Sequence, residues 1–233
     1  MDLKRRVERG LGSAATLLGA AATSYAGVVG AAWLRYGHAA APAADEMDPL
    51  LDIFMPAYDV AERHHIDVAA PAALTFGALM DMDLERSSVV RAIFKGRQLL
   101  LGADPHTKTA GRSLVEVTKA LGWVVLADMP GHEIVMGAVT RPWEPNVVFR
   151  SLPSEEFASF NEPEYVKIVW TLRADAVSQY SSIARSETRA IATDAESRRK
   201  FRWYWARFSP GIVLIREISL RLVKKEAERR ARM

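Results

Sequence analysis

Two pairs of neighbouring residues are the first candidates for metal or acid-base chemistry in this 233-residue sequence. His64 and His65 lie in an alternating stretch, and His132 and Glu133 follow a predicted tight turn. Adjacent residues of a strand point to opposite faces, so His64 and His65 cannot bind one metal ion together without a bulge. We therefore expect the two histidines to be structural, and His132 and Glu133 to be solvent-exposed.

The short motifs of common enzyme chemistry do not occur in the sequence. There is no G-x-S-x-G, no H-E-x-x-H, no Walker loop and no dinucleotide fingerprint. There is also no cysteine, which excludes a disulfide framework, a thiolate nucleophile and a Cys-ligated zinc site. We predict no catalytic residue, no metal site and no cofactor.

The charge is balanced over most of the chain. The formal net charge is +3, and much of the surplus lies at the two ends, in residues 4–9 and 224–232. Binding to nucleic acid needs a basic stripe across a folded surface, which this distribution does not supply. We predict no nucleic-acid partner.

The stretch from Leu11 to Leu34 contains no charged residue. A helix of that length could cross a hydrocarbon core about 30 Å thick, although Ala, Gly, Ser and Thr dominate its composition. The favoured interpretation is a single-pass membrane anchor with a cytoplasmic N-terminus, which makes the membrane a partner. One alternative is a signal peptide cleaved within "HAAAPAAD", giving a secreted protein. The other is an Ala-rich helix packed on the domain or on a partner, in a cytoplasmic protein.

Three regions are expected along the chain. Residues 1–36 form the N-terminal apolar helix, and residues 37–57 form an Ala/Pro-rich linker followed by a lead-in. The apolar lead-in, "DPLLDIFMPAYDV", is expected to pack on the domain. Residues 58–233 form that domain.

The order of predicted elements begins with a strand and ends with a long helix. Alternation from Val60 to Val68 predicts the strand, and three helical stretches follow it before Gly122. A hairpin is predicted around Pro130-Gly131. Two clearer strands, "YVKIVWTLR" and "SSIARSETRAIAT", precede the last helix.

The last predicted strand has small residues on one face. Alternation sends Arg185, Glu187 and Arg189 to solvent as an exposed ladder of ion pairs. The residues that then face inward are Ala184, Ser186, Thr188 and Ala190. A protein interior is packed to crystal-like density, so something large must lie opposite them.

The C-terminal helix has the apolar stripe that could fill this space. Thr193 and Glu196 have the spacing of a capping box. The predicted stripe consists of Phe201, Trp205, Phe208, Ile212, Ile215, Ser219 and Leu222. Pro210 should bend the helix so that it follows a curved sheet.

Three segments carry a resemblance to a known superfamily: "ERHHIDVAAPAALTFGAL", "YVKIVWTLRA" and "ARSETRAIATDAESRRKFRWYWARFSPGIVLIR". They resemble the START-like, or SRPBCC, superfamily, which includes polyketide cyclases and lipid-transfer domains. The resemblance covers about Tyr58 to Arg230. It implies an α+β helix-grip fold, in which a curved antiparallel sheet wraps around a long C-terminal helix and leaves an internal cavity.

The expected function is to bind a hydrophobic small molecule or lipid in that cavity. The alternative is an enzyme of the polyketide cyclase or aromatase kind using the same cavity, which needs at least one ionisable group facing it. The sequence supports a binding protein more than an enzyme. The predicted cavity lining is Ile168, Trp170, Ala184, Ser186, Thr188, Trp205, Phe208 and Ile212.

Overall fold

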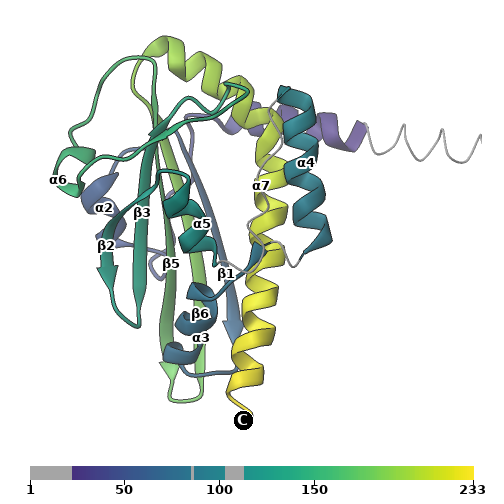
Figure 1. Cartoon of the computed structure of the whole chain (residues 1–233), viewed down its shortest axis with the longest axis vertical. Coiled ribbons are helices and arrows are strands. Elements are labelled where there is room, and N and C mark those ends of the chain that lie inside the picture. Colours follow the sequence, from purple (N-terminus) through teal and green to yellow (C-terminus); the bar gives the residue numbers. More distant parts are fainter. Residues whose placement is uncertain (1–22, 85–86, 103–112) are drawn as a thin grey trace, which may run out of the picture.

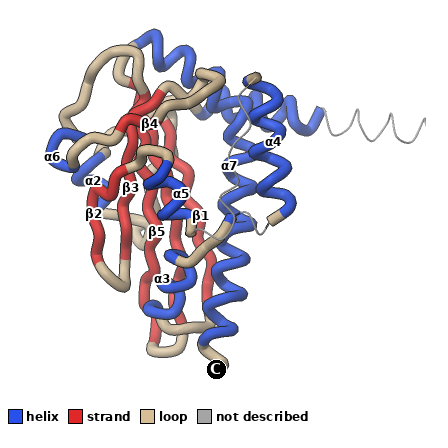
Figure 2. The backbone as a smooth tube through the Cα atoms, in the orientation of Figure 1, coloured by secondary structure: helices blue, strands red, loops and turns tan. Residues whose placement is uncertain are grey.

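The computed structural model describes residues 23–84, 87–102 and 113–233, and in them six antiparallel strands form one curved sheet (Figures 1 and 2). The strand order is β1-β6-β5-β3-β2, and β4 pairs with β3. The strands are β1 (Val60–Val68), β2 (Val124–Met129), β3 (Glu133–Thr140), β4 (Phe149–Arg150), β5 (Val166–Ser178) and β6 (Ser181–Ala192). This confirms the predicted α+β class with a curved antiparallel sheet.

The helices follow the predicted order. In the described residues they are α2 (Pro49–Phe54), α3 (Ala72–Met80), α4 (Ser88–Leu101), α5 (Leu114–Ala120), α6 (Ser154–Phe157) and α7 (Ala195–Arg230), besides a helical segment at 23–35. Strands β2 and β3 form the predicted hairpin, in which Gly131 has a φ of 79°. A left-handed conformation of this kind is one that glycine adopts without steric cost.

The sheet is covered on both faces. Helices α7 and α3 lie on one face, called here the inner face, while α2 and α6 lie on the opposite, outer face (Figure 1). The inner-face core contains Phe76, Leu79, Trp170, Leu172 and Leu220. Because β3 and most of β5 and β6 are covered on both faces, alternation along these strands does not separate core residues from solvent-exposed ones.

Helix α7 begins one residue later than predicted. Its N-cap is Asp194, whose carboxylate accepts hydrogen bonds from Ser197 N at 2.9 Å and from Glu196 N at 2.8 Å. The Ser197 hydroxyl in turn accepts from Asp194 N, which completes a capping box. Pro210 lies inside the helix, and Figure 1 shows that the first part of α7 crosses one end of the sheet before the rest runs along it.

The stripe predicted on α7 is right at its start and wrong at its end. Phe201, Trp205 and Ser219 are buried, whereas Leu222 is 37% exposed. The predicted stripe repeats every 3.5 residues, and a straight α-helix with 3.6 residues per turn drifts by about 20° per heptad from such a repeat. The buried positions at the C-terminal end are Leu220, Val223 and Ala227.

The lead-in packs on the domain, as predicted, and it does so on the outer face of the sheet. Leu51, Phe54 and Met55 are buried there against Val135 and Val169 of the sheet. Asp48 caps α2 by accepting a hydrogen bond of 2.8 Å from Leu51 N. Residues before β1 are therefore part of the core of the domain.

The described end of the N-terminal segment packs on α7. Arg202 donates a hydrogen bond of 2.9 Å to Trp33 O, and the rings of Trp33 and Trp203 lie 4.4 Å apart. The ring of Tyr36 meets Phe201 edge-on at 5.9 Å. Such packing is what the third interpretation of this segment expects.

The predicted anchor from Leu11 to Leu34 lies only partly in the described structure, since residues 11–22 fall outside it. None of the helices in the described part of the chain is long and apolar enough to cross a membrane. The basic residues 4–9 also fall outside the described residues.

Candidate functional site between the sheet and helix α7

The inner face of β6 carries the small residues that alternation predicted there. Ala184 belongs to the inner-face core, and Ser186 and Thr188 point to the same side, toward α7. In the sheet, Ser186 stands opposite His64 of β1 and Leu172 of β5. The short side chains of β6 therefore leave room for a long side chain from the helix.

That long side chain is Arg216 of α7. Its Nη1 donates a hydrogen bond of 3.0 Å to Ser186 Oγ, and its Nη2 donates one of 2.9 Å to Thr188 Oγ1. The guanidinium carbon lies 5.8 Å from the centre of the Trp170 ring, which is within range of a cation-π interaction. Arg216 is thus held against the middle of the inner face.

The charge of Arg216 has no acidic partner within the described structure. No carboxylate of the described residues lies within 4.0 Å of its guanidinium. Burial lowers the pKa of Arg216 to about 10, so the group remains protonated at neutral pH. The residue is nevertheless half-buried rather than fully buried, which means that part of this deep side chain can be reached by solvent.

Two ionisable residues of β1 lie on the same face. Glu62 stands opposite Thr188, and its Oε2 lies 3.7 Å from His64 Nε2. Burial raises the pKa of Glu62, and the positive charge of Arg35 opposes this shift. Burial lowers the pKa of His64, and the positive charge of Arg216 lowers it further.

The Nε2 atom of His64 is buried and makes no hydrogen bond to the described residues. A buried polar atom without a partner is rare in folded proteins, because its desolvation is not compensated. His64 also lines a cavity of about 190 Å³ between β1 and α7, together with Ile66, Glu217 and Leu220. His64 therefore lines this cavity, and in the sheet it pairs with Ser186, the residue that accepts from Arg216.

The predicted lining residues divide into two groups. Trp170, Ala184, Ser186 and Thr188 lie around Arg216 on the inner face, in the middle of the sheet. The others, at the end of the sheet where α7 begins, are Ile168, Trp205, Phe208 and Ile212. Trp205 is buried against Phe201, whereas Ile168, Phe208 and Ile212 are half-buried.

Arg216, Glu62 and His64 were not among the predicted site residues. Sequence reasoning missed Arg216 because a charged residue on an amphipathic helix normally points to solvent. The available signal was its position: Arg216 follows Ile212 by four residues and precedes Leu220 by four, so it lies on the sheet-facing side.

The ladder of ion pairs on the other side of β6 is buried, which corrects the prediction that it is exposed. Arg185, Glu187 and Arg189 are 8%, 5% and 1% exposed. The Glu187 carboxylate lies 2.7 Å from Arg189 Nε and 3.1 Å from Arg63 Nη2. The lead-in that carries α2 covers these side chains, and Asp52 of α2 pairs with Arg189.

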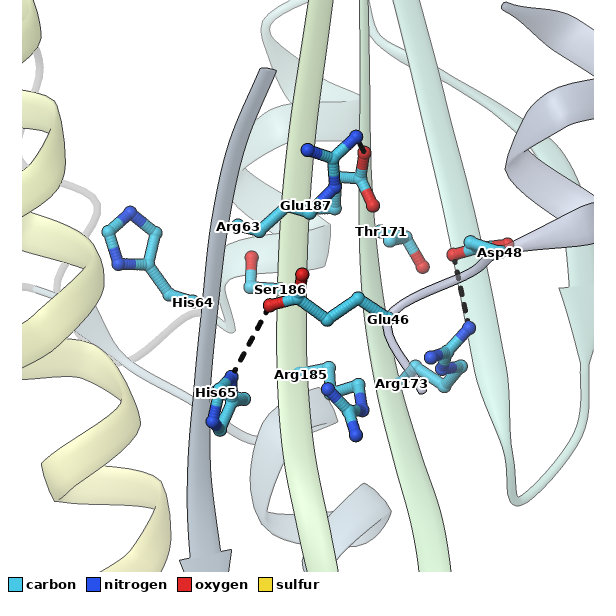
Figure 3. A pocket seen from close by; sticks show the side chains of 10 residues that line it. All are labelled: Glu46, Asp48, Arg63, His64, His65, Thr171, Arg173, Arg185, Ser186 and Glu187. Carbon is cyan, nitrogen blue, oxygen red and sulfur yellow. Dashed lines mark ion pairs between the residues drawn. The ribbon is translucent and has the colours of Figure 1, made fainter. Parts of the chain in front are cut away.

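The same polar cluster continues toward β5 and β3 (Figure 3). Asp175 lies 3.0 Å from Arg173 Nε and 2.7 Å from Arg185 Nε, and Asp48 lies 3.5 Å from Arg173 Nη1. The cavity here is about 20 Å³, enough for about one water molecule and too small for an organic ligand. In Figure 3, His64 points away from this cluster, toward α7.

His132 and Glu133 were predicted to be solvent-exposed, and this prediction is wrong. Glu133 is 3% exposed and accepts a hydrogen bond of 2.6 Å from Thr171 Oγ1. Burial raises its pKa to about 8, with a further contribution from the Asp48 carboxylate. The His132 ring packs near Ala174 O, 3.2 Å from its Nδ1. Within the described ranges, no three His, Asp or Glu side chains are placed to share a metal ion.

Comparisons with known proteins give no family. No family model matches the chain, and no curated protein matches it. Among solved structures, a Thermobifida fusca protein determined by solution NMR has a TM-score of 0.33 at 12% identity, over 72% of this chain and 93% of the other. The Zhui aromatase/cyclase from Streptomyces sp. R1128 has a TM-score of 0.25 at 15% identity, over 73% of this chain and 94% of the other. Similarities this low carry no argument about function, so the functional argument rests on the site itself.

Proposed function

We propose that this protein binds a small organic molecule with an apolar body between the inner face of the sheet and α7. The observation that carries this proposal is the accessibility of residues that face each other across that space. Ile168 lies on a central strand and Ile212 on the helix opposite, yet both are only half-buried. Their neighbours on the outer face of β5, Lys167 and Val169, are buried.

The composition of this region supports the proposal. Binding sites for small molecules are mostly apolar and contain a few polar groups that fix the orientation of the ligand. Ile168 and Ile212 supply apolar surface, while Ser186, Thr188 and Arg216 supply polar atoms. The pocket of about 190 Å³ beside His64 is lined by Ile66, Glu217 and Leu220 and not by Ile168 or Arg216. It is smaller than the 300 to 1,000 Å³ that is typical of drug-sized ligands, so a compact ligand is expected in this region.

The test is native mass spectrometry of the purified full chain, compared with its mass after denaturation. We expect excess mass from a copurifying molecule in the native spectrum. The variant Ile168→Trp, which fills the space, should lose it. Val177→Trp on the same strand, at a position that is 64% exposed, should retain it. If neither copurification nor added apolar ligands give a bound species, the proposal is wrong.

A second candidate function is acid-base catalysis of the cyclase kind, and the observation favouring it is the Glu62 and His64 pair. A cyclase was expected to need an ionisable group on this face, and His64 has a lowered pKa, which keeps its ring neutral and able to accept a proton at pH 7. The probe is acetylacetone in D₂O, whose α-proton exchange is followed by NMR. Catalysed exchange that His64→Gln abolishes would support an enzyme. Exchange no faster than with equimolar imidazole would contradict it.

Lipid as the ligand, and attachment to a membrane through the N-terminal segment, remain predictions from the sequence. The mature N-terminus and its distribution between membrane and supernatant, measured by fractionation and mass spectrometry of the full chain, test both the anchor and the signal-peptide interpretation. An intact N-terminus in the supernatant would favour the packed-helix alternative.

A further inference from the structure

We propose that the molecule bound between the sheet and α7 carries a carboxylate, and that Arg216 with the hydroxyls of Ser186 and Thr188 forms the site for it. This inference rests on the proposed binding function and adds the chemical class of the ligand. Its first basis is the charge of Arg216, which has no acidic partner among the described residues. A cation that loses part of its hydration on folding, as the half-buried Arg216 does, is normally paired with an acid that compensates for the loss.

The second basis is a surplus of hydrogen-bond donors. A guanidinium has five N–H donors, and Arg216 uses one on Ser186 and one on Thr188, which leaves three. Each hydroxyl accepts from Arg216 and still has its own O–H to donate. Among the described residues, neither hydroxyl donates to an acceptor. Several donors therefore converge where no acceptor is present, and a carboxylate supplies acceptors only.

The third basis is how firmly Arg216 is positioned. Two hydrogen bonds to adjacent inward positions of β6 fix the plane of the guanidinium against a rigid sheet, and Trp170 covers it from the next strand. A planar guanidinium matches the geometry of a carboxylate with two parallel hydrogen bonds. One cation fits a monoanion. The apolar body of the ligand would lie on Ile168, which is half-buried one inward position further along β5 from Trp170.

Other charged groups near the site are compatible with an anion. Glu62 is on the same face, but its interactions are with Arg35 and His64, and its pKa is raised by burial. Glu217 follows Arg216 in sequence, and its carboxylate lies 3.7 Å from Arg221. The Nε2 of His64 makes no hydrogen bond to the described residues, and it can donate to an anion when that nitrogen is protonated.

The experiment measures affinities by isothermal titration calorimetry for two pairs of probes with the full chain. The aromatic pair is 2-naphthoate and 2-naphthalenemethanol, and the aliphatic pair is octanoate and octanol. In each pair the apolar body is shared and only one member is an anion. We expect the carboxylate to bind at least about tenfold more tightly than its alcohol in one pair. The pair that shows this preference indicates whether the apolar body of the ligand is aromatic or aliphatic.

Variants assign this preference to Arg216. Arg216→Gln should reduce the preference of the carboxylate over its alcohol to less than about twofold. Arg221→Gln, on the same helix at a side chain that is 74% exposed, should preserve it. If Arg216→Gln does not fold, Arg216→Lys serves as the second variant and should retain only part of the preference.

The outcomes separate this inference from the function on which it rests. Equal binding of carboxylate and alcohol, or a preference that survives in Arg216→Gln, overturns the carboxylate site and leaves the binding function standing. Absence of binding for all four probes, together with no copurifying molecule, overturns both.

Discussion

Glu187 Oε1 accepts a hydrogen bond of 2.7 Å from Arg189 Nε, and both side chains are buried on the outer face of the sheet. The same oxygen lies 3.1 Å from Arg63 Nη2. One acid therefore neutralises part of the charge of two buried arginines.

Removing this acid should destabilise the fold strongly. Glu187→Ala removes the carboxylate that neutralises part of the charge of Arg63 and Arg189. Removing one partner of a buried ion pair costs about 3 to 5 kcal/mol. The free energy of unfolding in urea measures the effect. Glu162→Ala, which breaks an exposed pair with Arg150, is the control and should have a much smaller effect, because water and salt screen an exposed ion pair. Equal effects of the two substitutions would contradict the structural role of Glu187.

Glu133 should make stability depend on pH. Its pKa is raised from 4.5 to about 8, so between these values the folded state holds a proton that the unfolded chain releases. The stability that this group contributes is fully present below pH 4.5 and is lost as pH rises through 8. Glu133→Gln imitates the protonated acid, so its Tm should rise relative to wild type between pH 5 and pH 8.5. A constant difference in Tm across this range would show that Glu133 is not the titrating group.

His64 should titrate below its ordinary value because of burial and the charge of Arg216. Arg216→Gln removes that charge, so the pKa of His64 should rise in this variant while the shift caused by burial remains. The measurement is an NMR titration of the ring protons, with the His64 signal assigned by its loss in His64→Gln. An unchanged His64 pKa in Arg216→Gln would mean that the two groups are not close.

Two glycines should respond to alanine in opposite directions. A Cβ at Gly137 on β3 would lie 2.4 Å from Leu126 Cδ1 and 3.0 Å from Phe157 Cε2, and such overpacking costs about 1 to 3 kcal/mol. A Cβ at Gly96 within α4 would meet no atom within 4 Å. Alanine is favoured over glycine inside a helix by about 0.5 to 1 kcal/mol, so Gly96→Ala should stabilise. Thermal unfolding of both variants checks the two signs.

Local sequence patterns predicted the inner face of the sheet well. Alternation placed Ser186 and Thr188 toward the helix, and Pro130-Gly131 marked the hairpin. Both are properties of contiguous residues, which is why a single sequence suffices to predict them. The cap of α7 was wrong by one residue because Thr193 and Asp194 are both good N-cap residues, and only the backbone conformation decides between them.

The outer face and the candidate site could not be predicted in the same way, since both depend on residues far apart in the chain. Arg189 has the pattern of a solvent-exposed residue, and it is buried because Asp52 and Met55 come from a segment more than 130 residues earlier. Arg216 has the pattern of an exposed helical residue, and it faces the sheet because β6 carries hydroxyls that can accept from it. A polar residue is buried where a partner from a distant part of the chain forms hydrogen bonds or ion pairs with it. The local pattern of apolar and polar residues carries no information about that partner.

The acidic segment that precedes β1 and packs on the outer face determines how far the domain can be shortened from its N-terminal side. Asp45, Asp48 and Asp52 all precede β1, and each of them meets an arginine of β5 or β6. A fragment that begins at Tyr58 would keep every strand, but among the described residues the arginines of the outer face would retain only Glu187 and Asp175 as acidic partners in ion pairs. The apolar residues that α2 covers would be exposed to water. The shortest piece of this chain that keeps these ion pairs therefore starts ahead of Asp45, well upstream of the first strand.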